Sequence, residues 1–261
     1  MKYIWIVGAS SGIGEALVRQ LENPDCTIFI SARNEQKLLD IAQASSNKLI
    51  VLPLDVCDET TVNRASAHIQ SITNALDQVI INAGTCEYID SNKIDISVVK
   101  NIMNTNFFGA LNIVNAALPM LRHKIQLASN AKTLPQLVFM SSSVAYQALP
   151  RAGAYGSSKV ALRYFAECLK LDLQHEGVDV RVISPGFVKT PLTDKNDFPM
   201  PFRVSAEQAS SRIQKGLKSK HFDIAFPRKF TSLLKFISIL PDTWRFKLVG
   251  KSSRHNKARI N

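Results

Sequence analysis

The sequence has few of the residues that build a disulfide framework or a metal centre. Only four of its 261 residues are cysteine, and they lie far apart with no Cys-x-x-Cys spacing. The five histidines do not cluster as metal ligands do. Disulfide-rich domains and zinc sites both require closely spaced ligands. We therefore expect neither a disulfide nor a metal ion, and we expect a reducing, cytoplasmic environment.

Long apolar runs are also missing. No stretch reaches the roughly 18 uncharged apolar residues of a membrane span, and the N-terminal segment YIWIV is too short for a signal peptide. That segment leads directly into a glycine-rich turn, which is typical of a first buried strand. Hydrophobic residues make up 46% of the chain, and one large α/β domain fits this length better than two small ones.

Acidic residues are scarce near the C-terminal end. Residues 228–261 contain nine Lys or Arg and a single acid, Asp242, so they carry +8 of the net charge of +11 and leave +3 for the rest of the chain. The basic character therefore belongs to a C-terminal extension, residues 227–261. The body, residues 1–226, has an ordinary charge balance.

Short apolar segments alternate with amphipathic segments along the body. We expect strands at residues 3–7, 27–31, 48–54, 78–82, 136–141 and 178–184, and helices at residues 13–21, 34–44, 58–73, 97–120 and 154–174. Asn34 is the expected N-cap of the second helix, and Pro119 is expected to end the fourth. Uninterrupted Val/Ile/Leu strands between helices indicate a parallel sheet covered on both faces, a three-layer α/β/α architecture.

A glycine-rich turn stands between the first expected strand and the first expected helix. Gly8, Gly12 and Gly14 have the spacing Gly-x-x-x-Gly-x-Gly. Glycines there let the backbone approach a pyrophosphate, and the helix that follows offers unpaired N–H groups and a positive dipole end. The spacing differs from the usual Gly-x-Gly-x-x-Gly fingerprint. By itself the turn therefore predicts either a dinucleotide site or an ordinary turn.

The segment GAYGSSKVAL, residues 153–162, places a phenol and an ammonium one helical turn apart. Tyr155 and Lys159 are at the i, i+4 spacing that puts two side chains on the same helix face. Most such pairs are ordinary surface neighbours, so the rest of the chain has to decide whether this one carries chemistry.

The chain's motifs occur together in the order of a known family. They are GASSGIG (8–14), LDV (54–56), NAG (82–84), NFFG (106–109), a serine cluster (141–143), YGSSK (155–159) and PGFVKT (185–190). The sequence resembles a classical short-chain dehydrogenase/reductase from residue 2 to about residue 226. The resemblance implies a Rossmann-type, doubly wound fold and an oxidoreductase that transfers a hydride between a nicotinamide cofactor and a carbonyl or alcohol. Val7 departs from the pattern, because the family usually has a threonine there that braces the NAG strand end.

The resemblance assigns catalytic roles to four residues. Tyr155 would be the general acid/base, Lys159 would lower its pKa and hold the nicotinamide ribose, Ser142 would orient the carbonyl, and Asn106 would hold a water in the proton relay. A phenol titrates near pH ~10, and a nearby cation with the positively charged oxidised nicotinamide favours the phenolate. Ser143 stays open as an alternative to Ser142.

The resemblance also implies a cofactor site at the glycine turn, at the strand ends and in the segment after the sixth strand. Its residues are Gly8, Ser10, Ser11, Gly12, Ile13, Gly14, Asp55, Val56, Asn82, Ala83, Gly84, Tyr155, Lys159, Pro185, Gly186, Val188 and Thr190. Ala32 stands where an acid would bind the 2′-hydroxyl of NAD, and Arg33 follows it. A guanidinium can pair with a 2′-phosphate, so we expect NADP(H) in preference to NAD(H).

A lid is expected over about residues 187–217. Its apolar side chains suit an apolar carbonyl substrate, although they also fit a lid that merely packs on the body. By analogy with the family we expect a homodimer or homotetramer formed through the helices at 97–120 and 154–174.

The basic extension, residues 227–261, is expected to contain an amphipathic helix with Phe230, Leu233, Leu234, Ile237 and Leu240 at helical spacing. It either docks on its own domain or a partner subunit, or contacts an anionic membrane surface. No nucleic-acid reading motif is present in the sequence. Two alternatives to an enzyme remain, a catalytically silent NADP-binding sensor and a membrane-peripheral interaction protein on the same fold.

Overall fold

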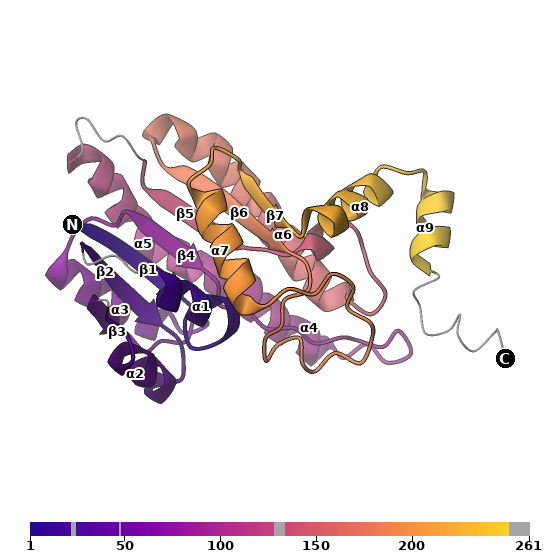
Figure 1. Cartoon of the computed structure of the whole chain (residues 1–261), viewed down its shortest axis with the longest axis horizontal. Coiled ribbons are helices and arrows are strands. Elements are labelled where there is room, and N and C mark those ends of the chain that lie inside the picture. The colour runs from indigo at the N-terminus through magenta and orange to yellow at the C-terminus, as the bar shows by residue number, and fades with distance from the viewer. Residues whose placement is uncertain (22–24, 47, 128–133, 251–261) are drawn as a thin grey trace.

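The computed structural model describes residues 1–21, 25–46, 48–127 and 134–250. At its centre is a seven-stranded parallel sheet with the strand order β3-β2-β1-β4-β5-β6-β7 (Figure 1). The strands are β1 (Lys2–Val7), β2 (Cys26–Ser31), β3 (Lys48–Val51), β4 (Gln78–Ile81), β5 (Gln136–Met140), β6 (Asp179–Pro185) and β7 (Asp223–Phe226). The order reverses between β1 and β4, which makes the sheet doubly wound, as the sequence predicts.

Helices cover both faces of the sheet. They are α1 (Gly12–Gln20), α2 (Glu35–Gln43), α3 (Glu59–Ile72), α4 (Ile96–Met103), the π-turn η1 (Asn104–Phe108), α5 (Gly109–Leu127), the 3₁₀ turn η2 (Ser143–Ala145), α6 (Gly153–Leu173), the 3₁₀ turn η3 (Gln174–Glu176), α7 (Ala206–Leu217), α8 (Arg228–Ser238) and α9 (Asp242–Gly250). No helix in these described ranges is long and apolar enough to cross a membrane.

The apolar runs of the strands explain the three layers. Along β1, Trp5 and Val7 belong to the core formed with α3, α5 and α6, whereas Ile4 and Ile6 belong to the core formed with α1, α2 and α7. Successive side chains of a strand point to opposite faces, so a strand that is apolar at every position must be covered on both. The predicted three-layer α/β/α fold is confirmed.

Local capping fixes the start of two helices. The Asn34 side chain accepts a hydrogen bond from the Lys37 backbone N–H at 3.0 Å, as expected for the N-cap of α2. Asp58 accepts in the same way from Thr60 at 2.9 Å and caps α3. Each side chain satisfies a helix N–H that has no partner inside the helix.

The prediction of a single helix over residues 97–120 is wrong in two respects. It is interrupted by the π-turn η1 between α4 and α5, and it does not end at Pro119, because α5 continues to Leu127. Pro119 and Asn115, the residue whose helical partner the proline removes, are both exposed, so the missing hydrogen bond falls on the solvent side. The buried Met120 and Leu121 then hold the rest of the helix against the sheet.

The sheet has one strand more than the six expected. β7 pairs with β6 over four residues, for example Ile183 with Ile224. In addition, α7 occupies the last part of the segment expected to be the lid, and its Ala209 and Ile213 are buried in the core beside α1. That part of the segment is a layer of the fold.

The C-terminal extension begins with two helices that differ in their contacts. Phe230, Thr231 and Leu234 of α8 are buried against the body, and Lys235 pairs with Asp223 of β7 at 2.9 Å. In contrast, α9 buries none of its residues. Figure 1 shows it standing away from the body beyond α8.

Candidate functional site

The glycines of the turn leave the backbone at the N-terminus of α1 uncovered by side chains. Gly8 and Gly12 have φ angles of +87° and +58°, which L-residues with side chains rarely adopt. A Cβ on Gly14 would lie 2.1 Å from the Gly8 carbonyl oxygen, and one on Gly12 would lie 2.9 Å from Cγ2 of Thr190. The turn is therefore closed to side chains and presents N–H groups at a helix N-terminus, which suits a pyrophosphate.

The end of β4 lies against this turn. The Asn82 side chain donates a hydrogen bond to the Gly8 carbonyl at 2.7 Å, and a Cβ on Gly8 would lie 2.5 Å from the Ala83 nitrogen. Val7, which stands in place of the expected threonine, is fully buried and packs in the core. The Asn82 side-chain amide itself joins the end of β4 to the end of β1.

Ser142 and Tyr155 meet at the carboxyl end of the sheet. The two side chains form a hydrogen bond that lowers the pKa of Tyr155, but burial acts more strongly and raises that pKa overall. Ser143 is buried. The structure therefore brings Ser142, and not its neighbour, to the phenol.

Lys159 lies behind the phenol and is almost completely buried. Its Nζ donates to the Met140 carbonyl at 2.9 Å and lies 5.7 Å from the centre of the Tyr155 ring. Burial lowers the pKa of Lys159 to about 8. The sequence predicts a lowered pKa for Tyr155. The protein without a bound cofactor does not lower it, because the loss of water around the phenol outweighs the hydrogen bond from Ser142.

Asn106 links the end of β4 to the helix that carries Tyr155 and Lys159. Its amide nitrogen donates to the Thr85 carbonyl and to Ser158 Oγ, both at 2.9 Å, and its oxygen accepts from the Thr85 N–H at 2.7 Å. Ser158 donates in turn to the Tyr155 carbonyl at 2.7 Å. The side chain thus braces the site, and it sits within the π-turn η1, an irregularity that often marks functional positions.

Three predicted residues lie at the β2–β3 edge of the cofactor region. Arg33 is exposed just beyond the end of β2, and the Asp55 carboxylate accepts a hydrogen bond from the Cys57 N–H at 2.9 Å. Val56 is buried, and its carbonyl accepts from the Asn112 side chain at 2.9 Å. Asp55 therefore already shapes the loop that enters α3, which leaves its adenine contact as a prediction.

The segment after β6 closes over the glycine turn. The Gly186 N–H donates to the Phe226 carbonyl at 2.7 Å, and the buried Val188 forms an isolated bridge with Val204. Thr190 reaches the glycine turn, as its contact at Gly12 shows. Pro185 ends β6, so residues 185–190 pass from the sheet directly to the turn.

Two residues of the site were missed from the sequence. Cys86 and Tyr88 lie two and four residues after Gly84. Burial raises the pKa of Cys86 to about 11, and Cys86 in turn raises the pKa of Tyr88 and of Tyr155. The Tyr88 ring meets Phe198 edge to face, with centroids 5.1 Å apart. Their position just after a parallel strand's carboxyl end, where ligands of such sheets bind, was the available signal.

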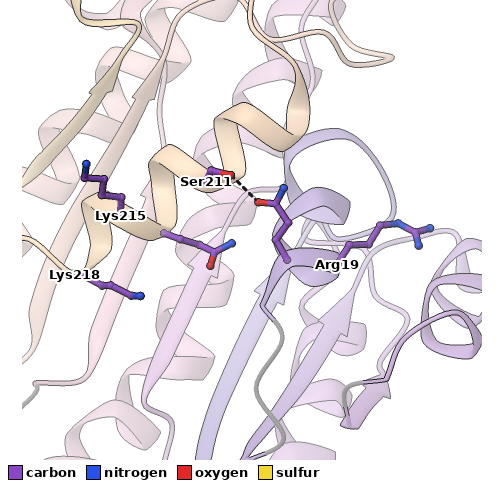
Figure 2. Close-up of a pocket in the computed structure, with 6 residues that line it drawn as sticks. Arg19, Ser211, Lys215 and Lys218 are labelled. Carbon is purple, nitrogen blue, oxygen red and sulfur yellow. Dashed lines mark hydrogen bonds between the residues drawn. The ribbon is translucent and has the colours of Figure 1, made fainter.

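A pocket lies elsewhere on the surface. It lies between α1 and α7, has a volume of about 550 Å³ and is lined by Arg19, Gln20, Ser211, Gln214, Lys215 and Lys218. Figure 2 shows these lining side chains. Ser211 donates to Gln20 across the pocket at 3.2 Å. None of the predicted site residues lines this pocket. In the described parts of the chain, no group of His, Cys, Asp or Glu side chains is arranged to hold a metal ion.

A doubly wound parallel sheet with a glycine turn at its switch point is the architecture of dinucleotide-binding proteins. Beside that turn stand a phenol, a hydroxyl and an ammonium suited to proton transfer. Residues 2–199 match the family model described as short chain dehydrogenase. The chain belongs to the short-chain dehydrogenase/reductase family, and it is an NAD(P)-dependent oxidoreductase.

Curated relatives agree with this assignment. An uncharacterized oxidoreductase of Myxococcus xanthus is 32% identical over 241 residues, which cover 91% of this chain and 92% of that protein. The 11-beta-hydroxysteroid dehydrogenase 1A of Arabidopsis thaliana is 30% identical over 82% of this chain and 60% of its own length. The chain thus spans about three fifths of that relative and 61% of a family protein of Anopheles gambiae.

Solved structures share the fold at low identity. A short-chain dehydrogenase from Burkholderia cenocepacia, in complex with NADP, matches with a TM-score of 0.79 and 18% identity over 95% of this chain and 99% of that one. A relative from Burkholderia phymatum, in complex with NAD, matches with a TM-score of 0.78 and 17% identity over 90% of this chain and 92% of that one. The neighbours therefore include complexes with both cofactors.

Proposed function

We propose that this oxidoreductase uses NADP(H) to interconvert an apolar carbonyl compound and its alcohol, with Tyr155 as the proton donor or acceptor. The observation that carries the proposal is the meeting of Ser142, Tyr155, Lys159 and Asn106 beside the glycine turn. These residues come from three separate parts of the fold: Ser142 caps η2, Asn106 lies in η1, and Tyr155 and Lys159 lie in α6.

The raised pKa of Tyr155 favours one direction at neutral pH. A phenol that stays protonated can give its proton to a carbonyl oxygen, and Ser142, hydrogen-bonded to the same phenol, is placed to hold that oxygen. Oxidation of an alcohol requires the phenolate instead. We therefore expect carbonyl reduction to be efficient near neutrality and alcohol oxidation to increase with pH.

Lys159 and Asn106 support the phenol in different ways. The Lys159 ammonium supplies positive charge near the ring and reaches the edge of Gly84, where a Cβ would lie 3.3 Å from Nζ. Asn106 fixes the strand end relative to α6 through Thr85 and Ser158. We retain the water-holding role of Asn106 as a prediction beside this bracing role.

The residues fit a dinucleotide. The glycine turn and the N-terminus of α1 would hold its pyrophosphate, the Asn82–Gly84 turn and Lys159 its ribose, and residues 185–190 its nicotinamide end. When bound, the nicotinamide supplies or accepts the hydride. Arg33 supports a preference for NADP(H), because its exposed guanidinium stands at the end of β2 with Ala32 in place of an acid.

An aromatic wall beside the phenol supports an apolar substrate. Tyr88 and Phe187 both meet Phe198, with centroids 5.1 and 6.0 Å away, and Phe187 also packs on Phe230 at 5.5 Å. Such a wall favours apolar compounds over sugar phosphates. The plant relative named for hydroxysteroids has an apolar alcohol in its name.

Exposed apolar residues on α6 support a homo-oligomer. Val160, Tyr164 and Leu171 are spaced so that they share one face of the helix, and they are 48%, 70% and 65% exposed. Phe108, the last residue of η1, is 53% exposed. We propose that these residues pair two copies of the chain, whereas the cytoplasmic location stays a prediction from the cysteine pattern.

A panel of carbonyls and alcohols, assayed with NADPH and NADH by nicotinamide absorbance, tests the function. Tyr155→Phe is expected to lower turnover by about 10²–10⁴-fold while leaving the Kd for NADPH unchanged. Ser142→Ala should lower turnover as well, and Ser143→Ala serves as the matched control. No turnover by the parent chain on any substrate, despite NADPH binding, would support the silent sensor instead.

A further inference from the structure

The outer face of α8 is apolar although its inner face already has a partner. Phe230 and Leu234 are buried on the body side, while Leu233 and Phe236 on the opposite side are 50% and 58% exposed. Lys229 lies four residues before Leu233 and seven before Phe236, so the three share one helix face. A helix that only docked on its own domain would have a polar outer face.

The helix α9 has apolar side chains and no buried residue. Trp244, Phe246 and Leu248 are 67%, 59% and 48% exposed. Isolated helices of this length are marginal in water, and three large exposed apolar residues add to that cost. A surface outside the described part of the chain is therefore needed to cover α9.

The charge around these helices indicates the nature of that surface. Helices α8 and α9 contain five Lys or Arg and one acid, and residues 251–261 add four Lys or Arg and no acid to the sequence. Lys235 and Arg245 have acidic partners, Asp223 and Asp242. A broad surface that is negatively charged and accepts tryptophan and phenylalanine side chains is the headgroup region of an anionic bilayer.

We propose that the outer face of α8 together with α9 docks on an anionic membrane surface. Leu233, Phe236, Trp244 and Leu248 would enter the headgroup boundary, and the cations around them would contact lipid phosphates and carboxylates. A second copy of this chain is the less favoured occupant, because it would bring the same excess of positive charge to the interface.

The lid packs on the inner face of α8, across the helix from the docking face. Phe202, which is 54% exposed, lies 6.3 Å from Phe230 of α8, and Phe230 packs on Phe187. A bilayer on the outer face of α8 would therefore be separated from the aromatic wall near Tyr155 only by this helix and the exposed Phe202. This route for an apolar substrate rests on the proposed function, whereas the docking itself does not.

Co-sedimentation of the full chain with vesicles tests the docking. Binding is expected to vesicles with roughly 30% phosphatidylserine and to fall sharply on pure phosphatidylcholine or at high salt. Neutralising Lys229→Gln together with Lys247→Gln should weaken binding about 25-fold, at about fivefold per cation. Phe236→Ser with Trp244→Ser should abolish it.

Matched substitutions on α2, at the opposite edge of the sheet, serve as controls. Lys37→Gln and Leu39→Ser remove the same side-chain types from exposed positions and should leave vesicle binding intact. NADPH oxidation with a water-miscible carbonyl separates the two proposals, because the α8 and α9 variants should retain it. Absence of vesicle binding by the parent chain, or a loss of dimer mass in the Phe236→Ser, Trp244→Ser variant, would overturn the membrane proposal.

Discussion

Replacing Lys159 with methionine is expected to stabilise the fold while lowering turnover. The side chain is 4% exposed, and burial lowers its pKa from 10.5 to about 8. The unfolded chain binds this proton more tightly than the folded chain does, so folding with a charged Lys159 is unfavourable. At about 1.4 kcal/mol per pKa unit, the charged ammonium costs the fold about 3 kcal/mol near pH 7.

Methionine has a similar length and no charge, so it removes this cost. It also leaves the Met140 carbonyl without the hydrogen bond that Lys159 Nζ donates at 2.9 Å, a loss of about 1–2 kcal/mol. The variant should therefore be more stable than the parent by about 1–2 kcal/mol near pH 7. The parent gains stability as pH rises from about 8 to 10.5, so above that window the variant should be the less stable protein.

Urea unfolding of parent and variant, near pH 7 and above pH 10.5, measures the difference at both ends of the window. Lys37→Met, on the exposed side of α2, corrects for the loss of one positive charge. Turnover of the Lys159→Met variant should be lower by about 10²–10⁴-fold. A variant that is less stable than the parent near pH 7, by the same amount as at high pH, would refute the cost assigned to the buried ammonium.

Two further substitutions test the cofactor end of the site. Arg33→Ala should raise the KM for NADPH tenfold or more, because a charge-assisted hydrogen bond to phosphate contributes about 1.5–3 kcal/mol, while the KM for NADH should stay within about twofold; equal changes in both would contradict the assignment. Gly14→Ala places a Cβ 2.1 Å from the Gly8 carbonyl oxygen, and we expect a loss of about 3 kcal/mol or more in unfolding experiments. Gly156→Ala is the control, since its Cβ would meet only Val144 at 3.6 Å, and equal losses would disprove the steric argument.

The fold could be predicted because its signals are local. Each residue of a strand covered on both faces must be apolar, and β1 shows this with Ile4 and Ile6 toward one layer and Trp5 toward the other. The N-caps Asn34 and Asp58 act within three residues of their own position. Such features are set by neighbouring residues, so the sequence displays them directly.

The remaining features depend on contacts between distant segments. β7 is four residues long and is a strand only because β6 lies beside it, and the apolar wall needs Tyr88 and Phe198 from two separate loops. The direction of the Tyr155 pKa depends on how much water the fold excludes around the phenol. The sequence predicted which residues lie together at the site but not the environment that sets their proton affinities.

The π-turn at Asn104–Phe108 interrupts a regular helix, and it places the Asn106 side-chain amide within hydrogen-bonding distance of its partners. A π-turn holds one more residue than an α-turn. The extra residue lies in the turn from which Asn106 donates hydrogen bonds to Thr85 and Ser158. Deletion of one residue from this turn would let α4 and α5 join as one continuous α-helix. It would also rotate Asn106 by about a quarter of a turn about the helix axis, away from both partners. We therefore expect the deletion variant to have a more regular helix and a lower turnover than the parent.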